Sequence, residues 1–271
     1  MFQLYPLCAF QDNYIWMLQH PSHPGLAVAV DPGQSAPVEE WLKRHHLKLA
    51  AILVTHHHPD HTGGIQQLAD PEIPVYGPVN SPFKGITLPV SDNDRIELLG
   101  QSLRVKSVPG HTLDHIAYYT DGAHAENPNQ SPSLEPDTPQ LFCGDTLFIA
   151  GCGRLFEGSA EQLQQAMFFF RGLNDQTQVC CAHEYSLSNL SFATAVEPDN
   201  VAIQIATERC RKLRSEGLAT VPGQIGEEKQ INPFMRYDQP SVIQSAERLS
   251  GKKLTNDALV LAAIRQWKDH F

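Results

Sequence analysis

The chain has 271 residues, of which 41% are hydrophobic and 18% are charged, as is typical of a globular protein. Its net charge of −10 argues against nucleic-acid binding, and no stretch approaches the roughly 18 consecutive apolar residues of a membrane-spanning helix. The first residues lack the cationic region of a signal peptide, so we expect a cytoplasmic protein with no membrane partner. The six cysteines form no C-x-x-C pair, which favours reduced thiols over metal ligands.

The first elements in the chain are two strands and a helix. Apolar, β-branched runs predict strands at Asn13–Leu18 and Leu26–Val30, and the second strand ends in the turn Asp31-Pro32-Gly33. The Asp31 carboxylate could support a metal site, but the preferred interpretation is that it caps this turn. Ser35 then predicts the N-cap of a helix that runs to about His46.

The most informative stretch follows a short apolar run, Ala50–Val54, that predicts a buried strand. Directly after it stands Thr55-His56-His57-His58-Pro59-Asp60-His61, which contains the pattern His-x-His-x-Asp-His. Imidazole nitrogens and carboxylate oxygens are the usual ligands of zinc and similar metals. Four ligands are more than one tetrahedral ion takes from a single loop, so the natural division is His56 with His58 and Asp60 with His61. Because the pattern follows a core-type strand, a solvated histidine tract or a terminal tag is disfavoured.

Three later strands also end in candidate ligands. The second strand of a predicted hairpin over 95–108 leads to His111, a strand from Leu141 ends at Asp145, and a strand over 177–182 is followed by His183. Active sites in layered α/β proteins gather where strand ends meet. The ligand sets are therefore predicted as His56, His58 and His111 on one ion and Asp60, His61 and His183 on the other, with Asp145 bridging both.

The remaining segments predict a surface insertion and a helical tail. The polar, proline-rich segment 123–140 has no periodicity and is predicted to be an insertion. Ser159 and Gln162 form a capping box that predicts a helix to Arg171. After His183 the sequence predicts four helices, with an extended segment over 220–233, and a domain boundary near residue 184. The predicted helices span 186–196, 200–216, 239–249 and 255–270.

The motifs together resemble a known family. Thr-His-x-His-x-Asp-His, Gly-His-Thr, Gly-Asp-Thr and His-Glu-Tyr resemble the metallo-β-lactamase superfamily. Further stretches are similar to one branch of it, the hydroxyacylglutathione hydrolases or glyoxalases II. These stretches are Asn13-Tyr14, Asp31-Pro32-Gly33, Gly151-Cys152-Gly153-Arg154, Cys181-Ala182-His183-Glu184-Tyr185, Glu197-Pro198 and Asn232-Pro233-Phe234-Met235-Arg236. The resemblance covers essentially the whole chain.

The resemblance implies an αββα sandwich over 1–183, which binds two divalent metal ions, and a helical glutathione-binding domain over 184–271. Zinc is the expected metal, with iron and manganese as alternatives. The implied reaction is hydrolysis of S-D-lactoylglutathione to D-lactate and glutathione, the second step of methylglyoxal detoxification. We also expect the chain to be a monomer. The implied glutathione contacts are Arg154, Tyr185, Arg265 and Lys268.

Two positions depart from the family pattern. Phe156 stands where many members have Tyr, and Asp114 stands where Gly is frequent, which predicts a further carboxylate near His115. Without the resemblance, Arg265 and Lys268 would be interpreted as a solvated basic face at a helix C-terminus.

The implied chemistry suits the residues. Two metals about 3.5–4 Å apart lower the pKa of a bridging water to about 7, and Asp60 can bind metal and accept a hydrogen bond from the resulting hydroxide. Alternatives are another dinuclear metallohydrolase, such as a lactonase, or an iron-dependent dioxygenase or redox member of the superfamily. A lactonase would not need Arg154, Arg265 or Lys268.

Overall fold

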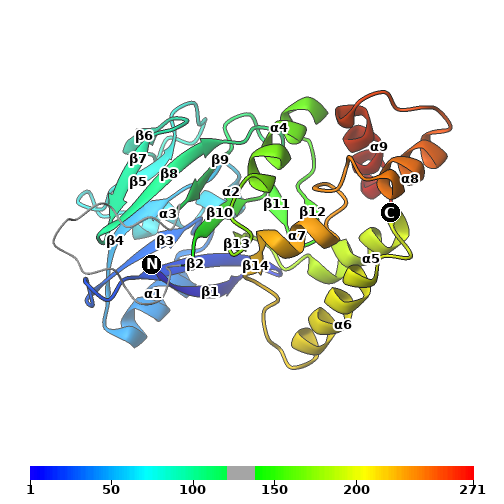
Figure 1. Cartoon of the computed structure of the whole chain (residues 1–271). Coiled ribbons are helices and arrows are strands. Elements are labelled where there is room, and N and C mark those ends of the chain that lie inside the picture. The colour runs from blue at the N-terminus through cyan, green and yellow to red at the C-terminus, as the bar shows by residue number, and fades with distance from the viewer. Residues whose placement is uncertain (121–137) are drawn as a thin grey trace, which may run out of the picture. The chain divides into compact units, whose positions relative to one another are not determined.

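The computed structural model describes residues 1–120 and 138–271, which form two compact units (Figure 1). The first unit comprises Met1–Ser107 with Asp114–Gly144, and the second comprises Val108–Leu113 with Asp145–Phe271. Within the described ranges, no helix combines the length and apolar character needed to cross a membrane.

The first unit contains a mixed sheet with the strand order β1-β2-β3-β4-β5-β6. Its strands are β1 (Gln3–Ala9), β2 (Asn13–Gln19), β3 (Leu26–Val30), β4 (Lys48–Leu53), β5 (Val75–Pro78) and β6 (Leu88–Val90). Strands β1 to β3 are antiparallel, and β3 to β6 are parallel. Parallel neighbours need a long crossover, which helix α1 (Ser35–His45) provides between β3 and β4. Strand β1 has no counterpart among the predicted strands.

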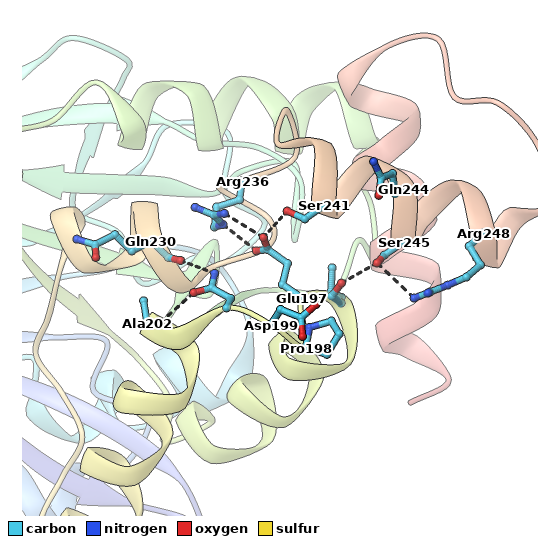
Figure 2. Close-up of a pocket in the computed structure, with 12 residues that line it drawn as sticks. Glu197, Pro198, Asp199, Ala202, Gln230, Arg236, Ser241, Gln244, Ser245 and Arg248 are labelled. Carbon is cyan, nitrogen blue, oxygen red and sulfur yellow. Dashed lines mark hydrogen bonds and ion pairs between the residues drawn. The ribbon is translucent and has the colours of Figure 1, made fainter.

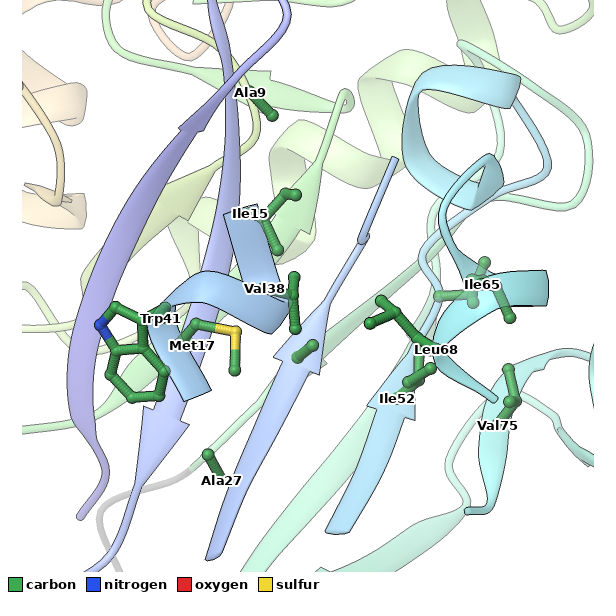
Figure 3. Packing of buried hydrophobic residues seen from close by; sticks show 12 residues of the cluster. Ala9, Ile15, Met17, Ala27, Val38, Trp41, Ile52, Ile65, Leu68 and Val75 are labelled. Atoms are coloured by element: carbon green, nitrogen blue, oxygen red, sulfur yellow. The ribbon is translucent and has the colours of Figure 1, made fainter. Parts of the chain in front are cut away.

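Helices α1 and α3 (Ile65–Leu68) pack on this sheet through apolar side chains. Figure 3 shows this cluster, in which Val38, Trp41, Ile65 and Leu68 of the helices lie with Ile15, Met17 and Ile52 of the strands. Strands β2 and β3 are buried along almost their whole length, which explains why their sequences are continuously apolar rather than alternating. This core fixes the end of β4, where the histidine-rich loop begins.

Four further strands of the first unit form an antiparallel array in the order β7-β8-β9-β10. They are β7 (Arg95–Leu98), β8 (Gln101–Ser107), β9 (Ile116–Tyr119) and β10 (Gln140–Gly144). The predicted hairpin is confirmed, and its turn residues Leu99 and Gly100 both have positive φ, 51° and 78°, which matches the twist of paired strands. The Tyr118 hydroxyl donates to the Val54 carbonyl at 3.0 Å and so connects β9 to the end of β4.

The second unit is mostly helical, with two short antiparallel pairs of strands. Its strands are β11 (Leu147–Phe148), β12 (Gly151–Cys152), β13 (Gln178–Cys181) and β14 (Gly223–Gln224). Its helices are α4 (Ala160–Arg171), α5 (Ser186–Val196), α6 (Val201–Ser215), α7 (Ile225–Ile231), α8 (Pro240–Ser250) and α9 (Asp257–Asp269). The capping box of Ser159 and Gln162 at the start of α4 is confirmed.

Two expectations about irregular segments need correction or fall outside the described residues. The segment 220–233 is not extended throughout, because helix α7 occupies Ile225–Ile231. The predicted insertion 123–140 lies almost entirely outside the described residues. At its end, however, Gln140 is a buried residue of β10 that exchanges two hydrogen bonds with the backbone of Phe2, at 3.2 and 2.8 Å.

Candidate active site

The loop after β4 brings the four candidate ligands of the first unit together. Helix α2 (Pro59–Thr62) forms a single turn, with His58 as its N-cap residue and Asp60 and His61 within it. His56 Nε2 lies 3.1 Å from His58 Nδ1, and Asp60 Oδ2 lies 3.5 Å from His61 Nε2. These are the two pairs that the sequence predicts.

The spacing within each pair fits a shared metal ion. Two ligand atoms bound to one tetrahedral zinc ion at roughly 2.1 Å lie about 3.4 Å apart. The observed separations of 3.1 and 3.5 Å are close to that value, and the donors are imidazole nitrogens and a carboxylate oxygen. The residues of this loop can therefore contribute two ligands to each of two ions.

Asp31 supports this loop and does not merely cap a turn. Its carboxylate accepts hydrogen bonds from the Thr55 backbone N–H and from the Thr55 hydroxyl, both at 2.7 Å. One of its oxygens also lies 3.1 Å from His61 Nδ1, and both side chains are buried. Such a contact orients a metal-binding imidazole and makes it more basic. The preferred interpretation of Asp31 as a turn cap is therefore wrong, and its sequence signal was only an acid at a strand end.

His57 and Asp114 form a second support of the same loop. His57 Nδ1 lies 2.9 Å from Asp114 Oδ1, and Asp114 is only 4% exposed. The carboxylate predicted beside His115 thus pairs with His57, the residue between the two candidate ligands. His115 instead stacks on His56, with ring centroids 4.5 Å apart. Sequence reasoning gave neither His57 nor His115 a role.

The close approach of the backbone explains one glycine of this region. A Cβ on Gly33 would lie 1.8 Å from the Asp60 carbonyl oxygen, so no larger residue fits there. The turn Asp31-Pro32-Gly33 therefore packs directly against the ligand loop.

The second unit holds the other three candidate ligands. His111 Nε2 lies 3.5 Å from Asp145 Oδ2, and His183 Nε2 lies 3.3 Å from Asp145 Oδ1. All three residues are buried, with exposures of 5–7%. Each Asp145 oxygen faces a different histidine, as expected of a carboxylate that bridges two ions, and both separations again fit ligands of one metal.

Backbone and aromatic contacts orient the two histidines. His111 Nδ1 lies 2.9 Å from the Arg154 carbonyl oxygen, which can only accept, so Nδ1 carries the proton and Nε2 is left to bind metal. The His183 ring stacks on Tyr185, with centroids 4.7 Å apart and an interplanar angle of 7°. Phe156, which is 62% exposed, presents its edge to His111 at 5.2 Å.

Three of the predicted glutathione contacts are cations, and two of them, Arg154 and Arg265, meet at Asp269. Arg154 Nε lies 3.6 Å and Arg265 Nη2 lies 3.1 Å from the same Asp269 oxygen. Arg265 is only 4% exposed and donates to the Cys152 carbonyl at 2.8 Å. The interpretation of Arg265 as part of a solvated face is therefore wrong. Asp269, which links these side chains, received no role from the sequence.

Lys268 is the most perturbed cation of this group. Its ammonium lies 5.2 Å from the centre of the Phe192 ring. Burial, and then the charge of nearby Arg265, lower the pKa of Lys268 to about 8. The side chain is thus charged at neutral pH but close to its titration point.

A cavity of about 570 Å³ lies in the second unit, among the ends of α5, α6, α7 and α8 (Figure 2). Glu197 accepts two hydrogen bonds from Arg236, at 2.7 and 2.9 Å, and one from Ser241 at 2.6 Å. Burial would raise the pKa of Glu197, but the bonds from Arg236 and Ser241 outweigh it and lower that pKa. None of the predicted site residues is among those that line this cavity. Glu197 and Arg236, two of the residues that carried the resemblance, therefore join helices to one another.

Comparison with known proteins defines the class. The family model of the metallo-beta-lactamase superfamily matches residues 12–125. ETHE1 from Myxococcus xanthus has a TM-score of 0.61 at 22% identity, over 99% of this chain and 98% of that chain. A metallo-beta-lactamase from Staphylococcus aureus has a TM-score of 0.60 at 18% identity, over 99% of this chain and 72% of that chain. Residues 12–125 thus match the metallo-β-lactamase superfamily, and the predicted αββα sandwich with a helical C-terminal region is confirmed.

Full-length relatives narrow the assignment to one family. Hydroxyacylglutathione hydrolase from Hahella chejuensis is 45% identical over 272 residues, and that from Pseudomonas putida is 46% identical over 273 residues; both alignments cover 100% of each chain. The model of the hydroxyacylglutathione hydrolase C-terminus matches residues 184–271. The chain is therefore a member of the hydroxyacylglutathione hydrolase family, as its motifs predict.

Proposed function

We propose that the chain hydrolyses S-(2-hydroxyacyl)glutathione thioesters, with S-D-lactoylglutathione as substrate and D-lactate and glutathione as products. The observation that carries this proposal is the full-length similarity to hydroxyacylglutathione hydrolases. It includes the C-terminal family match over residues 184–271, the part of the chain that supplies Arg265 and Lys268. The reaction would be the second step of methylglyoxal detoxification.

We infer that two divalent metal ions bind to the seven candidate ligands. In this assignment one ion takes His56, His58 and His111, the other takes Asp60, His61 and His183, and Asp145 bridges both. The assignment is supported by the ligand pairs within each unit, whose separations suit a shared ion. Zinc is the proposed metal because imidazole and carboxylate suit it, and iron or manganese would accept the same donors.

The bound ions would polarise the thioester carbonyl and supply hydroxide near neutral pH. Asp60 is the residue proposed to orient the attacking water. Its Oδ2 accepts a hydrogen bond from Asn13 Nδ2 at 3.0 Å, and the side chain is 40% exposed, so the carboxylate is fixed yet reachable. A carboxylate held in this way can accept a hydrogen bond from the nucleophile. The departing thiolate has a conjugate pKa of about 8.5, so it leaves without an obligatory general acid.

Glutathione is proposed to bind to Arg154, Tyr185, Arg265 and Lys268. The two carboxylates of glutathione suit charge-assisted hydrogen bonds from the exposed Arg154 and the half-buried Lys268. Tyr185 stacks on His183 and can place its hydroxyl near the thioester end. Because Arg265 is buried, its main proposed role is to hold the turn at Cys152 in place.

The same proposal assigns residues 1–183 to catalysis and residues 184–271 to glutathione binding, in a monomer. A cytoplasmic location is also proposed, since all six cysteines are free thiols, which suits a reducing compartment. Size-exclusion chromatography with light scattering and cell fractionation test these two points.

The deciding experiment is thioester hydrolysis of S-D-lactoylglutathione at neutral pH, with the metal content measured on the same sample. We expect rapid hydrolysis, about two metals per chain, and loss of activity in Asp145→Ala. A chain with two metals that cleaves lactones but not the thioester would contradict the glutathione assignment. A lactonase would also be indifferent to Arg154→Ala and Lys268→Ala, which should impair the thioesterase.

A further inference from the structure

The turn between β11 and β12 is held by side chains that come from distant helices of the second unit. Asn232 of the α7 end donates through Nδ2 to the carbonyl oxygens at both ends of the turn, Phe148 at 3.2 Å and Gly151 at 3.0 Å. Asn189 of α5 donates to the Ile149 carbonyl at 3.0 Å. The backbone carbonyl groups in the middle and at the ends of the turn thus form hydrogen bonds to side chains outside the hairpin.

Glu228 of α7 completes this arrangement. Its Oε2 accepts hydrogen bonds from the backbone N–H of Ala150 at 2.9 Å and from Asn232 Nδ2 at 2.8 Å. Glu228 and Asn232 are fully buried, and Asn189 is 2% exposed. We call Asn189, Glu228 and Asn232 the hairpin brace.

The chemistry of Glu228 suits a neutral acceptor. Burial raises the pKa of Glu228 to about 8, so the group is mostly uncharged at neutral pH. A neutral carboxyl can still accept both hydrogen bonds through its carbonyl oxygen. The bond to Ala150 matters because that residue has a φ of 54°, a left-handed conformation that costs a non-glycine residue roughly 1 kcal/mol or more.

The hairpin cannot hold this shape by its own pairing. Its two strands have only two residues each, and an isolated two-stranded hairpin is marginal even when it is longer. Unpaired backbone groups in a buried turn would each cost about 1–3 kcal/mol. The hairpin brace therefore selects one conformation of the turn.

The conformation of the hairpin matters for function because residues of the proposed site lie next to it. Asp145 stands two residues before β11, and Arg154 stands two residues after β12. Between them, the Phe148 ring lies edge-on to His183 at 5.8 Å and to Tyr185 at 5.2 Å. A shift of this turn would move the surface against which His183 and Tyr185 pack.

We propose that the hairpin brace is a positioning set for the substrate site: it fixes the β11–β12 turn and thereby holds Phe148, Tyr185 and Arg154 in the geometry that binds the glutathione part of the thioester. This inference rests on the proposed function, which assigns Tyr185 and Arg154 to glutathione. The three brace residues are buried and form hydrogen bonds to the turn, so they would act on the substrate through the turn.

The test compares Glu228→Met, which keeps the shape but removes the acceptor, with Glu228→Gln, which keeps a neutral acceptor. Steady-state kinetics with S-D-lactoylglutathione at pH 7 are combined with hydrogen exchange of the 147–152 segment in the metal-loaded enzyme. We expect Glu228→Gln to stay within twofold of the wild type in kcat and KM. Glu228→Met should raise KM at least tenfold, change kcat less, and accelerate exchange of the Ala150 amide.

Several outcomes would overturn the proposal. One is an unchanged KM and unchanged exchange in Glu228→Met; another is equal loss of activity in Gln and Met variants, which would mean that the acid itself is required. If Glu228→Met does not fold, Asn189→Ala decides, with a raised KM expected. A purely structural role would lower the folded fraction and leave KM unchanged. An inactive wild type would refute the proposed function. Hydrogen exchange of the 147–152 segment would still show whether the hairpin brace fixes the turn.

Discussion

Asp31 is buried behind His61 and has no direct part in the proposed chemistry, yet its carboxylate decides how that imidazole is presented. Loss of such a supporting group typically lowers metal affinity or activity 10–100-fold. We therefore expect the metal content of the Asp31→Ala variant to fall from about two ions per chain to about one after dialysis against a weak chelator. Hydrolysis should fall about 10–100-fold in the same samples, because the weakened ion is the one assigned to Asp60 and His61.

A suitable control for this variant is Asp92→Asn in the same unit. Asp92 also accepts a backbone N–H bond, from Ser107 at 2.7 Å, and pairs with Lys106, but it is exposed. It should retain both metals. Full metal retention in Asp31→Ala would show that the contact with His61 is incidental.

Lys268 gives a prediction about pH. Its pKa of about 8 means that the ammonium, which would attract a glutathione carboxylate, is present below pH 8 and is lost above it. The KM for the thioester should therefore rise between pH 7 and pH 9, by roughly tenfold if this charge contributes a typical charge-assisted hydrogen bond. Initial rates over a substrate series at each pH measure this.

The matched variant is Lys268→Arg, since the guanidinium stays charged throughout this range. Its KM should be nearly constant from pH 7 to pH 9, while Lys268→Met should have a high KM at every pH. The same steep rise of KM in Lys268→Arg would assign the titration to another group.

At the scale of elements, helix α9 carries two cations, Arg265 and Lys268, that have different proposed roles. Arg265 is buried against the carbonyl of Cys152 in β12, whereas Lys268 is partly exposed and lies over an aromatic ring. Removing Arg265 leaves buried polar partners unpaired. We expect Arg265→Met to lower the free energy of unfolding by about 2–4 kcal/mol.

The comparison is Lys268→Met on the same helix. Burial disfavours the charged form of Lys268, so this change should alter the free energy of unfolding by less than about 1 kcal/mol. Urea unfolding of both variants measures the difference. Equal destabilisation by the two substitutions would contradict this division of duties.

Elements with local signals were predictable from the sequence, and those defined by distant partners were not. The capping box of Ser159 and Gln162 fixes the start of α4 by contacts within four residues. Helix α7 was missed for two reasons. It has only seven residues and lies in a segment bounded by Gly223 and Pro233, and its buried face includes Glu228, which interrupts the apolar pattern. The reason for a buried acid there is the Ala150 amide, 78 residues away in the chain.

For the whole molecule, the candidate ligands were predictable from the sequence, whereas the residues that support them were not. All seven candidate ligands could be proposed from the sequence because each follows a predicted strand and belongs to a residue type that binds metal. The pairing of Asp31 with His61 and of Asp114 with His57 could not, because an acid at a loop gives no sign of which histidine will face it. Fold class was predictable from the motifs, whereas the backbone pairing of β1 was not.

The proposed sharing of ions by ligands of both units leads to a prediction about metal content. Single variants of each unit that affect one ion should lose the same metal: His61→Ala and His183→Ala should each retain about one ion per chain. If they serve one site, the double variant should also retain about one ion. By contrast, combining His61→Ala with His58→Ala should remove both ions.

The coupling of metal binding to folding adds a second readout. A site filled at 1,000 times its Kd stabilises the fold by about 4.1 kcal/mol, or roughly 10 °C in Tm. Each variant should lower the Tm of the metal-loaded protein by roughly that amount and leave the Tm of chelator-treated protein unchanged. A His61→Ala, His183→Ala double variant that binds no metal would show that the two histidines serve different ions.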